Sequence, residues 1–248
     1  MFFIVANFTL AGALLVIGVL TLRHVSRPRE YLFASLPLLF GLHQLDQGIV
    51  WLGLYGVGSH AVLHRAATVF VFYAQAVLPL LVPLAVWLIE PRGRKRMLIL
   101  ALAVLGGLLG AYVAWGLMTV PTRVYVHGGS LVYDNPMTEQ IWIAVVYVLT
   151  TCGSLILSRS VSIQIFGWLN LVGLSAVFIV AQYSFTALWC LYAALVSGIL
   201  YLHFVERRIA ALRSLREGEE ALSRDAEAEL DRLTRHLPRL RRFFLRTG

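Results

Sequence analysis

One apolar stretch, Leu32–Leu54, carries a group of polar residues that constrains the fold more than any other feature. As a helix, the stretch is long enough to cross a bilayer at about 1.5 Å per residue. Past its midpoint lie His43, Gln44, Asp46 and Gln47. An ionised carboxylate in a membrane span costs about 2.5–3.5 kcal/mol on insertion scales, so such a group faces a bundle interior or water. Other helices must therefore enclose this part of the chain.

The remainder of the chain supplies those helices. Hydrophobic residues make up 59% of the 248 residues and charged residues only 14%, whereas soluble domains carry about 25% charged residues. Other apolar runs of spanning length cover approximately residues 2–22, 62–89, 97–120, 137–157, 161–182 and 184–205. The sequence therefore predicts an all-α polytopic membrane protein, with a bundle of seven transmembrane helices over residues 1–205.

Basic residues predict the orientation of this bundle. Of the 21 Lys and Arg residues, 19 follow the first, third and fifth runs or lie in the tail after residue 205. Arg65 and Arg123 fall on the opposite side. Cytoplasmic loops are enriched in Lys and Arg, so we expect the N-terminus outside and the C-terminus in the cytoplasm. No nucleic-acid partner is expected, because eight acidic residues interrupt the basic tail.

The longest connection away from the basic side, residues 121–136, has a hairpin pattern. Two β-prone arms within Val124–Tyr133 flank the sequence His127-Gly-Gly-Ser130. This pattern predicts a small extracytoplasmic β-hairpin. The following Asn135-Pro136 pair offers a cap and a first-turn proline for the fifth helix, which we expect to begin near Met137.

Glycines and prolines mark two further positions in the bundle. Pro79 and Pro83 predict a kink in the third helix, which a bundle tolerates when neighbours satisfy the freed carbonyls. The Gly106-x-x-x-Gly110 spacing in the fourth helix permits a close helix contact. Coincidence of composition explains that single match equally well.

Residues 206–248 are expected to form a cytoplasmic amphipathic helical tail that Gly218 divides. Its apolar residues recur from Ala226 at four-three spacing, which is typical of a helix with a partner. The candidate partner-binding positions are Leu230, Leu233, Leu237, Leu240 and Phe244. The basic, aromatic segment Arg239–Arg246 suits the anionic surface of a lipid bilayer. Two alternatives remain open for the tail: a solvated amphipathic helix that lies on the bundle without a partner, or a helix that docks another membrane protein subunit.

The polar residues of the second helix form the candidate site. Residues 43 and 46 are three apart and residues 43 and 47 are four apart, so each pair shares a helix face. The third helix begins at the same outer surface with two polar residues. The candidate cofactor-binding cluster is therefore His43, Gln44, Asp46, Gln47, His64 and Arg65.

Two interpretations of this cluster involve no metal ion. In the first, Asp46 pairs with Arg65 and His43 finds a hydrogen-bond acceptor, so that the cluster fixes helix packing. In the second, the imidazole ligates haem or a chlorophyll-type pigment between aromatic rings. The rings available for that role are Trp51, Tyr55, Phe70, Phe72 and Tyr73.

A third interpretation is metal-assisted hydrolysis of a lipid. His43, Asp46 and His64 can supply three metal ligands and leave a position open for water. The nearest template is the alkaline ceramidase and adiponectin receptor superfamily of seven-helix zinc hydrolases. Its final helix carries a pair of histidines, whereas the seventh run here has only His203.

The second helix also resembles a known family. The segment Pro37-Leu-Leu-Phe-Gly-Leu-His-Gln-Leu-Asp-Gln-Gly-Ile-Val-Trp-Leu-Gly53, preceded by Arg27-Pro-Arg-Glu30, is similar to an H/Q-Q-x-x-E-G-x-x-W-L-G pattern. That pattern occurs in the second helix of a family of uncharacterised bacterial seven-helix membrane proteins. The resemblance covers residues 10–55 and implies the topology and a bacterial inner membrane, without an activity. Where the pattern has Glu, this chain has Gln47, with Asp46 one residue earlier.

The motifs of common enzymes are missing from the sequence. It contains no P-loop, G-x-S-x-G, dinucleotide-binding or kinase pattern. We therefore expect a non-enzymatic accessory or binding subunit of a larger inner-membrane assembly, with a polar pocket between the second and third helices. The alternatives are the metal-dependent hydrolase and a haem-binding, pigment-binding or sensor-type protein.

Overall fold

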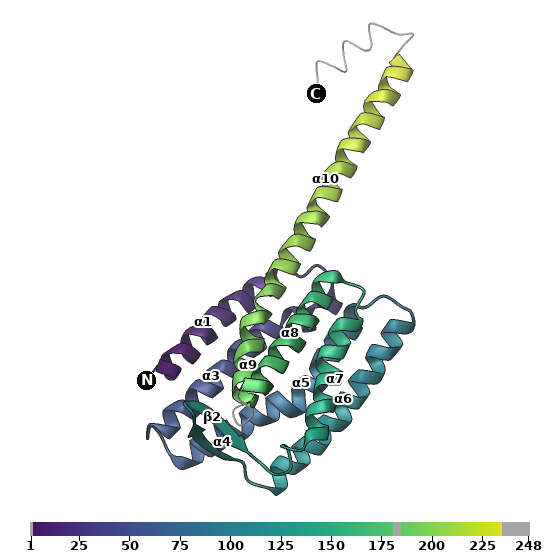
Figure 1. The fold of residues 1–248 in the computed structure, drawn as a ribbon. Coiled ribbons are helices and arrows are strands. Elements are labelled where there is room, and N and C mark those ends of the chain that lie inside the picture. The colour runs from purple at the N-terminus through teal and green to yellow at the C-terminus, as the bar shows by residue number, and fades with distance from the viewer. Residues whose placement is uncertain (1, 181–184, 235–248) are drawn as a thin grey trace. The chain divides into compact units, whose positions relative to one another are not determined.

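The structure is a computed structural model that describes residues 2–180 and 185–234 (Figure 1). The chain divides into two compact units, Met1–Phe204 and Val205–Gly248. Helices and one small hairpin make up the first unit. Its helices begin with α1 (Phe2–Arg23), η1 (Pro28–Glu30), α2 (Tyr31–Ala34), α3 (Leu36–Leu54), α4 (His60–Val71), the π-helical η2 (Phe72–Val77) and α5 (Leu78–Ile89). They continue with α6 (Arg94–Thr119), α7 (Ile141–Leu157), α8 (Val161–Val180), α9 (Phe185–Ser197) and the start of α10 (Ile199–Thr234).

Several of these helices can cross a membrane. Within the described residues, 5 helical stretches are long and apolar enough to do so: Phe3–Arg23, His60–Ile89, Arg94–Thr119, Val161–Val180 and Ala187–Glu229. The shorter α7 is also apolar. Helix α3 falls outside this group because four polar side chains lower its hydropathy. The all-α prediction and the multi-pass membrane prediction are confirmed.

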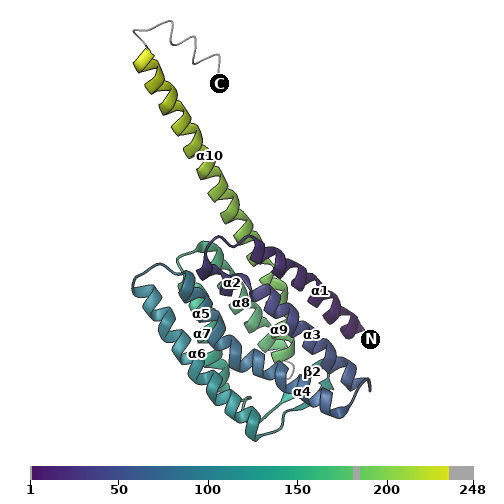
Figure 2. The same ribbon diagram turned by 180° about the vertical axis from the view of Figure 1, so that it is seen from behind.

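The connections within the first unit lie at two ends. The α1–α2, α5–α6 and α7–α8 connections share one end of the bundle, and the α3–α4 turn and the hairpin share the other (Figures 1 and 2). Basic residues are concentrated in the three connections of the first group, for example Arg27, Arg92 and Arg159. One end of the unit is therefore strongly basic and the hairpin end is not.

The predicted hairpin is confirmed. Strands β1 (Arg123–His127) and β2 (Ser130–Asp134) pair antiparallel, with Val124 opposite Tyr133. Gly128 and Gly129 join them at φ values of 58° and 81°, a left-handed turn that suits glycine. Buried residues of β2 pack on the bundle while most of β1 is exposed, so β2 carries its side chains into the protein.

The predicted start of the fifth helix is wrong. Helix α7 begins at Ile141 rather than near Met137, and the Asn135 side chain organises the loop instead. Its Oδ1 accepts from the Met137 backbone N–H at 3.0 Å, and its Nδ2 donates to the Val120 carbonyl oxygen at 3.0 Å. The same amide donates to Thr122 Oγ1 at 3.2 Å. Asn135 thus ties the two ends of the hairpin loop together.

The expected tail also differs from the structure. Helix α9 ends at Ser197, and α10 then continues without a break through Gly218 to Thr234. The abundance of Ala, Leu, Glu and Arg in this segment favours helix strongly enough to tolerate one glycine. Of the five candidate partner-binding residues, Leu237, Leu240 and Phe244 lie outside the described residues, as do the side chains of Leu230 and Leu233.

Two glycines of α6 pack on the backbone of η2 and the start of α5, close to Pro79. Pro79 lacks a backbone N–H and crowds the preceding turn, and the turn before it widens into the π-helical η2. A Cβ on Gly106 would overlap the Pro79 carbonyl oxygen, and a Cβ on Gly110 would overlap the Ala76 carbonyl oxygen. The predicted close contact of the Gly106-x-x-x-Gly110 motif is therefore confirmed, and it holds α6 against the π segment.

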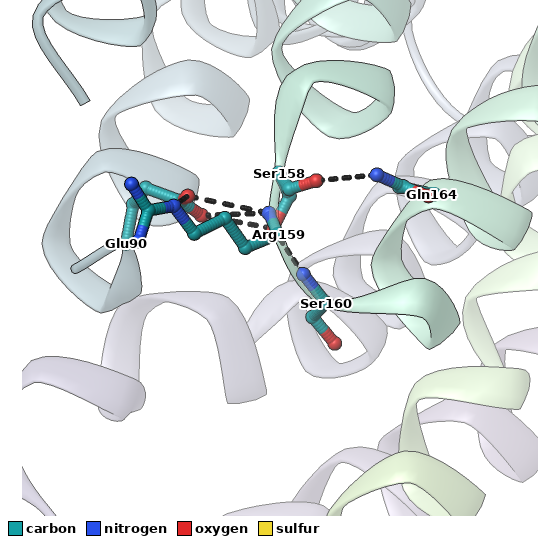
Figure 3. Close-up of polar contacts among 5 residues, drawn as sticks. All are labelled: Glu90, Ser158, Arg159, Ser160 and Gln164. Atoms are coloured by element: carbon teal, nitrogen blue, oxygen red, sulfur yellow. Dashed lines mark hydrogen bonds and ion pairs between the residues drawn. The ribbon is translucent and has the colours of Figure 1, made fainter. Parts of the chain in front are cut away.

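A buried carboxylate joins helices at the basic end (Figure 3). Glu90 is 4% exposed and accepts hydrogen bonds from Ser158 Oγ at 3.0 Å and from the Arg159 backbone N–H at 3.2 Å. The Arg159 guanidinium lies 3.8 Å from the carboxylate and is half exposed. Gln164 Nε2 donates to the Ser158 carbonyl oxygen at 2.6 Å. We call Glu90, Ser158, Arg159 and Gln164 the Glu90 clasp, which fastens α5 to the α7–α8 turn.

Alanine substitutions at the adjacent Gly106 and Gly107 test the close contact between α6 and the backbone near Pro79. Gly106→Ala forces backbone apart at Pro79 and is expected to cost about 1–3 kcal/mol, a fall of about 2–4 °C in Tm per kcal/mol. Gly107→Ala is the matched control, because a Cβ there meets only Leu80 Cδ1 at an ordinary 3.5 Å. Thermal unfolding of the purified protein in detergent measures both. Equal shifts for the two variants would contradict the assignment of the contact.

The Glu90 clasp predicts an asymmetric pair of mutant effects. Glu90→Leu leaves the Ser158 hydroxyl and the Arg159 N–H without their acceptor and is expected to cost about 1–3 kcal/mol. Arg159→Ala retains the backbone N–H and removes only a half-exposed guanidinium, so its effect should be under about 1 kcal/mol. Thermal unfolding compares the two. A larger loss from Arg159→Ala would mean that the ion pair, rather than the hydrogen bonds, holds the clasp.

Candidate functional site

Helix α3 presents glycines on one side and polar residues on another. A Cβ on Gly41 would meet the Leu15 backbone at 3.0 Å, and a Cβ on Gly48 would meet the Phe8 ring at 2.9 Å. These glycines bring α1 close to α3. His43, Gln44 and Gln47 are buried and Asp46 is half-buried, so the neighbouring helices enclose three of the four polar residues fully.

Aromatic rings from the continuous α4–η2 helix and from β2 pack beside α3. The His43 ring lies 4.0 Å from the Phe70 ring of α4 at an interplanar angle of 13°. The Phe70 ring in turn lies 4.5 Å from the Tyr133 ring of β2 at 12°. Tyr73 of η2 flanks the imidazole at 4.6 Å. We call His43, Gln44, Asp46, Gln47, Phe70, Tyr73 and Tyr133 the polar core.

The polar core holds an unusual number of buried polar atoms without partners. Within the part of the chain that the structure describes, none of these atoms has a hydrogen-bond partner: His43 Nε2, both amide atoms of Gln44, Asp46 Oδ2, Gln47 Oε1 and the hydroxyls of Tyr73 and Tyr133. Gln44 is 0% exposed. Each buried unsatisfied group costs about 1–3 kcal/mol, and native proteins keep such groups few. Their concentration makes the polar core the candidate site.

His64 and Arg65 lie outside this cluster. The buried residues of α4 include Leu63, Ala66 and Phe70, and this three- and four-residue spacing leaves both polar side chains exposed. Among the ion pairs between described residues, none joins Asp46 to Arg65. The sequence interpretation that pairs them is not what the structure has, because α4 turns its apolar face inward.

The structure does not assemble the residues that the sequence suggests for a metal ion or for a flat cofactor. The described residues contain no group of three His, Cys, Asp or Glu side chains that could hold a metal ion, so His43, Asp46 and His64 are not brought together as ligands. The rings expected to flank a flat cofactor have other contacts. Phe70 and Tyr73 pack directly on the imidazole, Trp51 stacks on Phe3 at 5.1 Å, and Phe72 is exposed.

A cavity of about 590 Å³ adjoins the polar core at the hairpin end. Tyr133 lines this cavity and belongs to the ring stack, so it connects the two. Trp189 Nε1 of α9 donates to Tyr147 Oη of α7 at 3.1 Å, and both residues line the cavity. Ligand pockets typically measure about 300–1,000 Å³. The cavity is therefore large enough for a small organic molecule.

Two loop residues of this region have perturbed acidity. Burial and the charge of Asp134 raise the pKa of the Glu139 carboxyl above its ordinary value. Burial and the charge of Asp46 raise the pKa of the Tyr133 hydroxyl. The second effect means that Asp46 and Tyr133 are near neighbours, although they lie 87 positions apart in the printed sequence. Tyr133 therefore links the cavity with Asp46 of the polar core.

The sequence interpretation misses the contribution of the hairpin. The sequence predicts the hairpin that contains Tyr133 but assigns neither Tyr133 nor the following Asp134 and Glu139 to the candidate site. The available signal is the aromatic Tyr133 in a strand whose neighbours Leu131 and Val132 are also apolar. Such a strand has to bury its side chains somewhere, and the polar core is what lies beneath it.

The comparison with protein families gives one result. Residues 2–216 match a family described as a family of unknown function, DUF6629. The chain belongs to this family. Both units of the fold contribute to the match, which includes the polar core, the hairpin and the first part of α10. No curated protein and no solved structure matches the chain.

Two substitutions of Tyr133 distinguish the contribution of its ring to stability from that of its hydroxyl. Tyr133→Ala removes a buried ring that packs on Phe70 and is expected to cost about 3–5 kcal/mol. Tyr133→Phe removes only a hydroxyl without a partner, so stability should be unchanged or higher. Thermal unfolding measures both variants. A clear destabilisation by Tyr133→Phe would show that the hydroxyl has a structural partner in solution.

Proposed function

We propose that this chain is a non-enzymatic, multi-pass membrane protein that binds a small ligand in the cavity that η2, the hairpin and α7 line beside the polar core. One observation carries the proposal: the polar core keeps several buried polar atoms unpaired next to a cavity of about 590 Å³. A ligand with polar groups can satisfy those atoms, which an apolar core of the same shape would not require. The aromatic stack fixes the walls of the site before binding.

The proposal includes an orientation in a bacterial inner membrane. Seven crossings place the basic connections in the cytoplasm, the N-terminus outside and the hairpin on the extracytoplasmic side. Support comes from the three basic connections at one end of the first unit and the hairpin at the other (Figure 1). The resemblance of the second helix to bacterial membrane proteins supports the choice of membrane. In this orientation the ligand reaches the cavity from outside the cell.

The second unit supports a further role as an accessory subunit of a larger membrane assembly. Apolar side chains on α10 are exposed at Ile209, Leu212, Leu215 and Leu222. An isolated helix gains most of its stability from packing of its apolar residues. Another membrane protein subunit that covers these leucines would provide that packing. The proposed role is to bring the ligand-binding bundle to that assembly.

Ligand binding is tested by two glutamine substitutions with opposite expected effects. Gln44→Leu removes two unpaired buried polar atoms, so the ligand-free protein should be at least as stable as wild type while the ligand is lost. Gln164→Leu removes a hydrogen bond of the Glu90 clasp and should lower Tm while the ligand is retained. Native mass spectrometry of protein purified from its own membranes detects the ligand, and thermal unfolding reports stability.

The opposite pattern contradicts the proposal. If wild-type protein carries no small molecule and Gln44→Leu lowers Tm, the polar core is structural. For the accessory role, co-purification of another subunit at constant ratio should be lost when Ile209, Leu212, Leu215 and Leu222 are all changed to Gln. Isolation of the protein alone from native membranes would contradict that role and leave ligand binding unaffected.

A further inference from the structure

The cavity beside the polar core combines aromatic rings with carboxylates. Its lining includes Tyr125, Tyr133, Tyr147, Phe178 and Trp189, together with the acidic Asp134 and Glu139. Among the described residues that line it, none is Lys, Arg or His. The chain as a whole carries a net charge of +8, so this cavity departs sharply from the average charge of the protein.

We propose that the cavity binds a small organic cation that carries a quaternary or tertiary ammonium group. The proposal rests on the proposed ligand-binding function and specifies the chemical class of its ligand. Aromatic faces attract such cations through their quadrupole, and groups of aromatic residues are the common recognition site for quaternary ammonium ions. Two carboxylates at the same cavity supply the opposite charge.

The rings are held in place before a ligand binds. Trp189 and Tyr147 are 4% and 6% exposed, and the hydrogen bond between their side chains restrains both rings. Tyr192 stacks on the Trp189 indole at 6.0 Å. Tyr133 is fixed by its stack on Phe70. A preorganised aromatic wall reduces the ordering cost of binding, which suits a cation without strong hydrogen-bonding groups.

The charges around the cavity favour a cation over an anion. Asp134 is half-buried, Glu139 is exposed, and the raised pKa of Glu139 results in part from the Asp134 charge. A bound cation between two carboxylates relieves that repulsion. Arg123 is the cross-strand neighbour of Asp134, but it does not line the cavity.

An independent feature also indicates a ligand. The Tyr133 hydroxyl is buried, has no hydrogen-bond partner among the described residues, and belongs to a residue that lines the cavity. A tertiary ammonium N–H, or a hydroxyl attached to a quaternary ammonium group, can pair with this oxygen. Ca²⁺ is a poorer candidate, because it takes six to eight oxygen ligands and aromatic rings dominate this wall.

The experiment uses ligands that differ in charge at nearly constant shape. Choline and its neutral carbon isostere, 3,3-dimethylbutan-1-ol, are titrated into the full-length protein in phosphatidylglycerol nanodiscs. Calorimetry measures affinity and thermal unfolding measures stabilisation. We expect choline and tetramethylammonium to bind and raise Tm, and the neutral isostere to bind at least about tenfold more weakly.

Variants locate the bound cation. Asp134→Asn combined with Glu139→Gln should weaken choline binding about tenfold or more, and Tyr125→Leu should weaken it severalfold at a largely exposed position where folding is not at risk. The control, Glu217→Gln combined with Glu219→Gln, removes two carboxylate charges from the second unit and should leave binding unchanged.

Phosphatidylcholine nanodiscs reveal the source of the ammonium group. A raised Tm without added choline identifies a lipid headgroup, and an unchanged Tm identifies a soluble cation.

Three results would overturn the inference. They are failure of both ammonium probes to bind, equal binding of the neutral isostere, and equal weakening by the two double variants. These outcomes are separable from the proposed function. A neutral or anionic molecule that co-purifies with wild type and is lost in Gln44→Leu would exclude the cation and retain ligand binding.

Discussion

The fold depends on enclosing the polar side chains of α3 within an apolar bundle. Lipid offers no hydrogen bonds to His43, Gln44 or Asp46, so neighbouring helices have to cover them. Glycines make this possible by geometry rather than by attraction. Gly41 and Gly48 bring α1 against one side of α3, and the Gly106-x-x-x-Gly110 motif brings α6 against η2. The helices approach closely at these glycines, while Phe70 and Tyr73 pack beside the His43 imidazole.

The hairpin completes this enclosure from outside the helices. β2 lies between α6 and α7 in sequence, yet its Tyr133 stacks on Phe70 and reaches the same cluster as His43. A strand is suited to this role because its side chains alternate between two faces. The left-handed turn at Gly128 and Gly129 sets the register that directs Tyr133 toward the bundle. The connection with the strongest β pattern thus becomes a wall of the candidate site.

Sequence patterns predicted the features that depend on local composition. Long apolar runs predicted the helices, a Gly-Gly turn between β-prone arms predicted the hairpin, and four polar residues in one run predicted the candidate site. The errors arise where packing decides. Asn135 is a residue type favoured at helix caps, but its side chain donates hydrogen bonds across the loop to Val120 and Thr122. His64 and Arg65 lie near the predicted depth, and the apolar face of α4 turns them outward. Tyr133 could not be assigned to the site because the Phe70 ring on which it stacks is distant in sequence.

Two acidic residues of the first unit, the buried Glu90 and the half-buried Asp46, have different surroundings. At the basic end, Glu90 is buried and its carboxylate accepts from Ser158 and from the Arg159 backbone, so the Glu90 clasp satisfies its charge within the protein. In the polar core, Asp46 Oδ2 has no partner among the described residues, and the same is true of both amide atoms of Gln44. The chain therefore provides donors for a buried carboxylate where stability requires them. Among the described residues, the unpaired atoms of the polar core have no such partners, and buried unpaired groups lower stability. The proposed ligand would offset that cost.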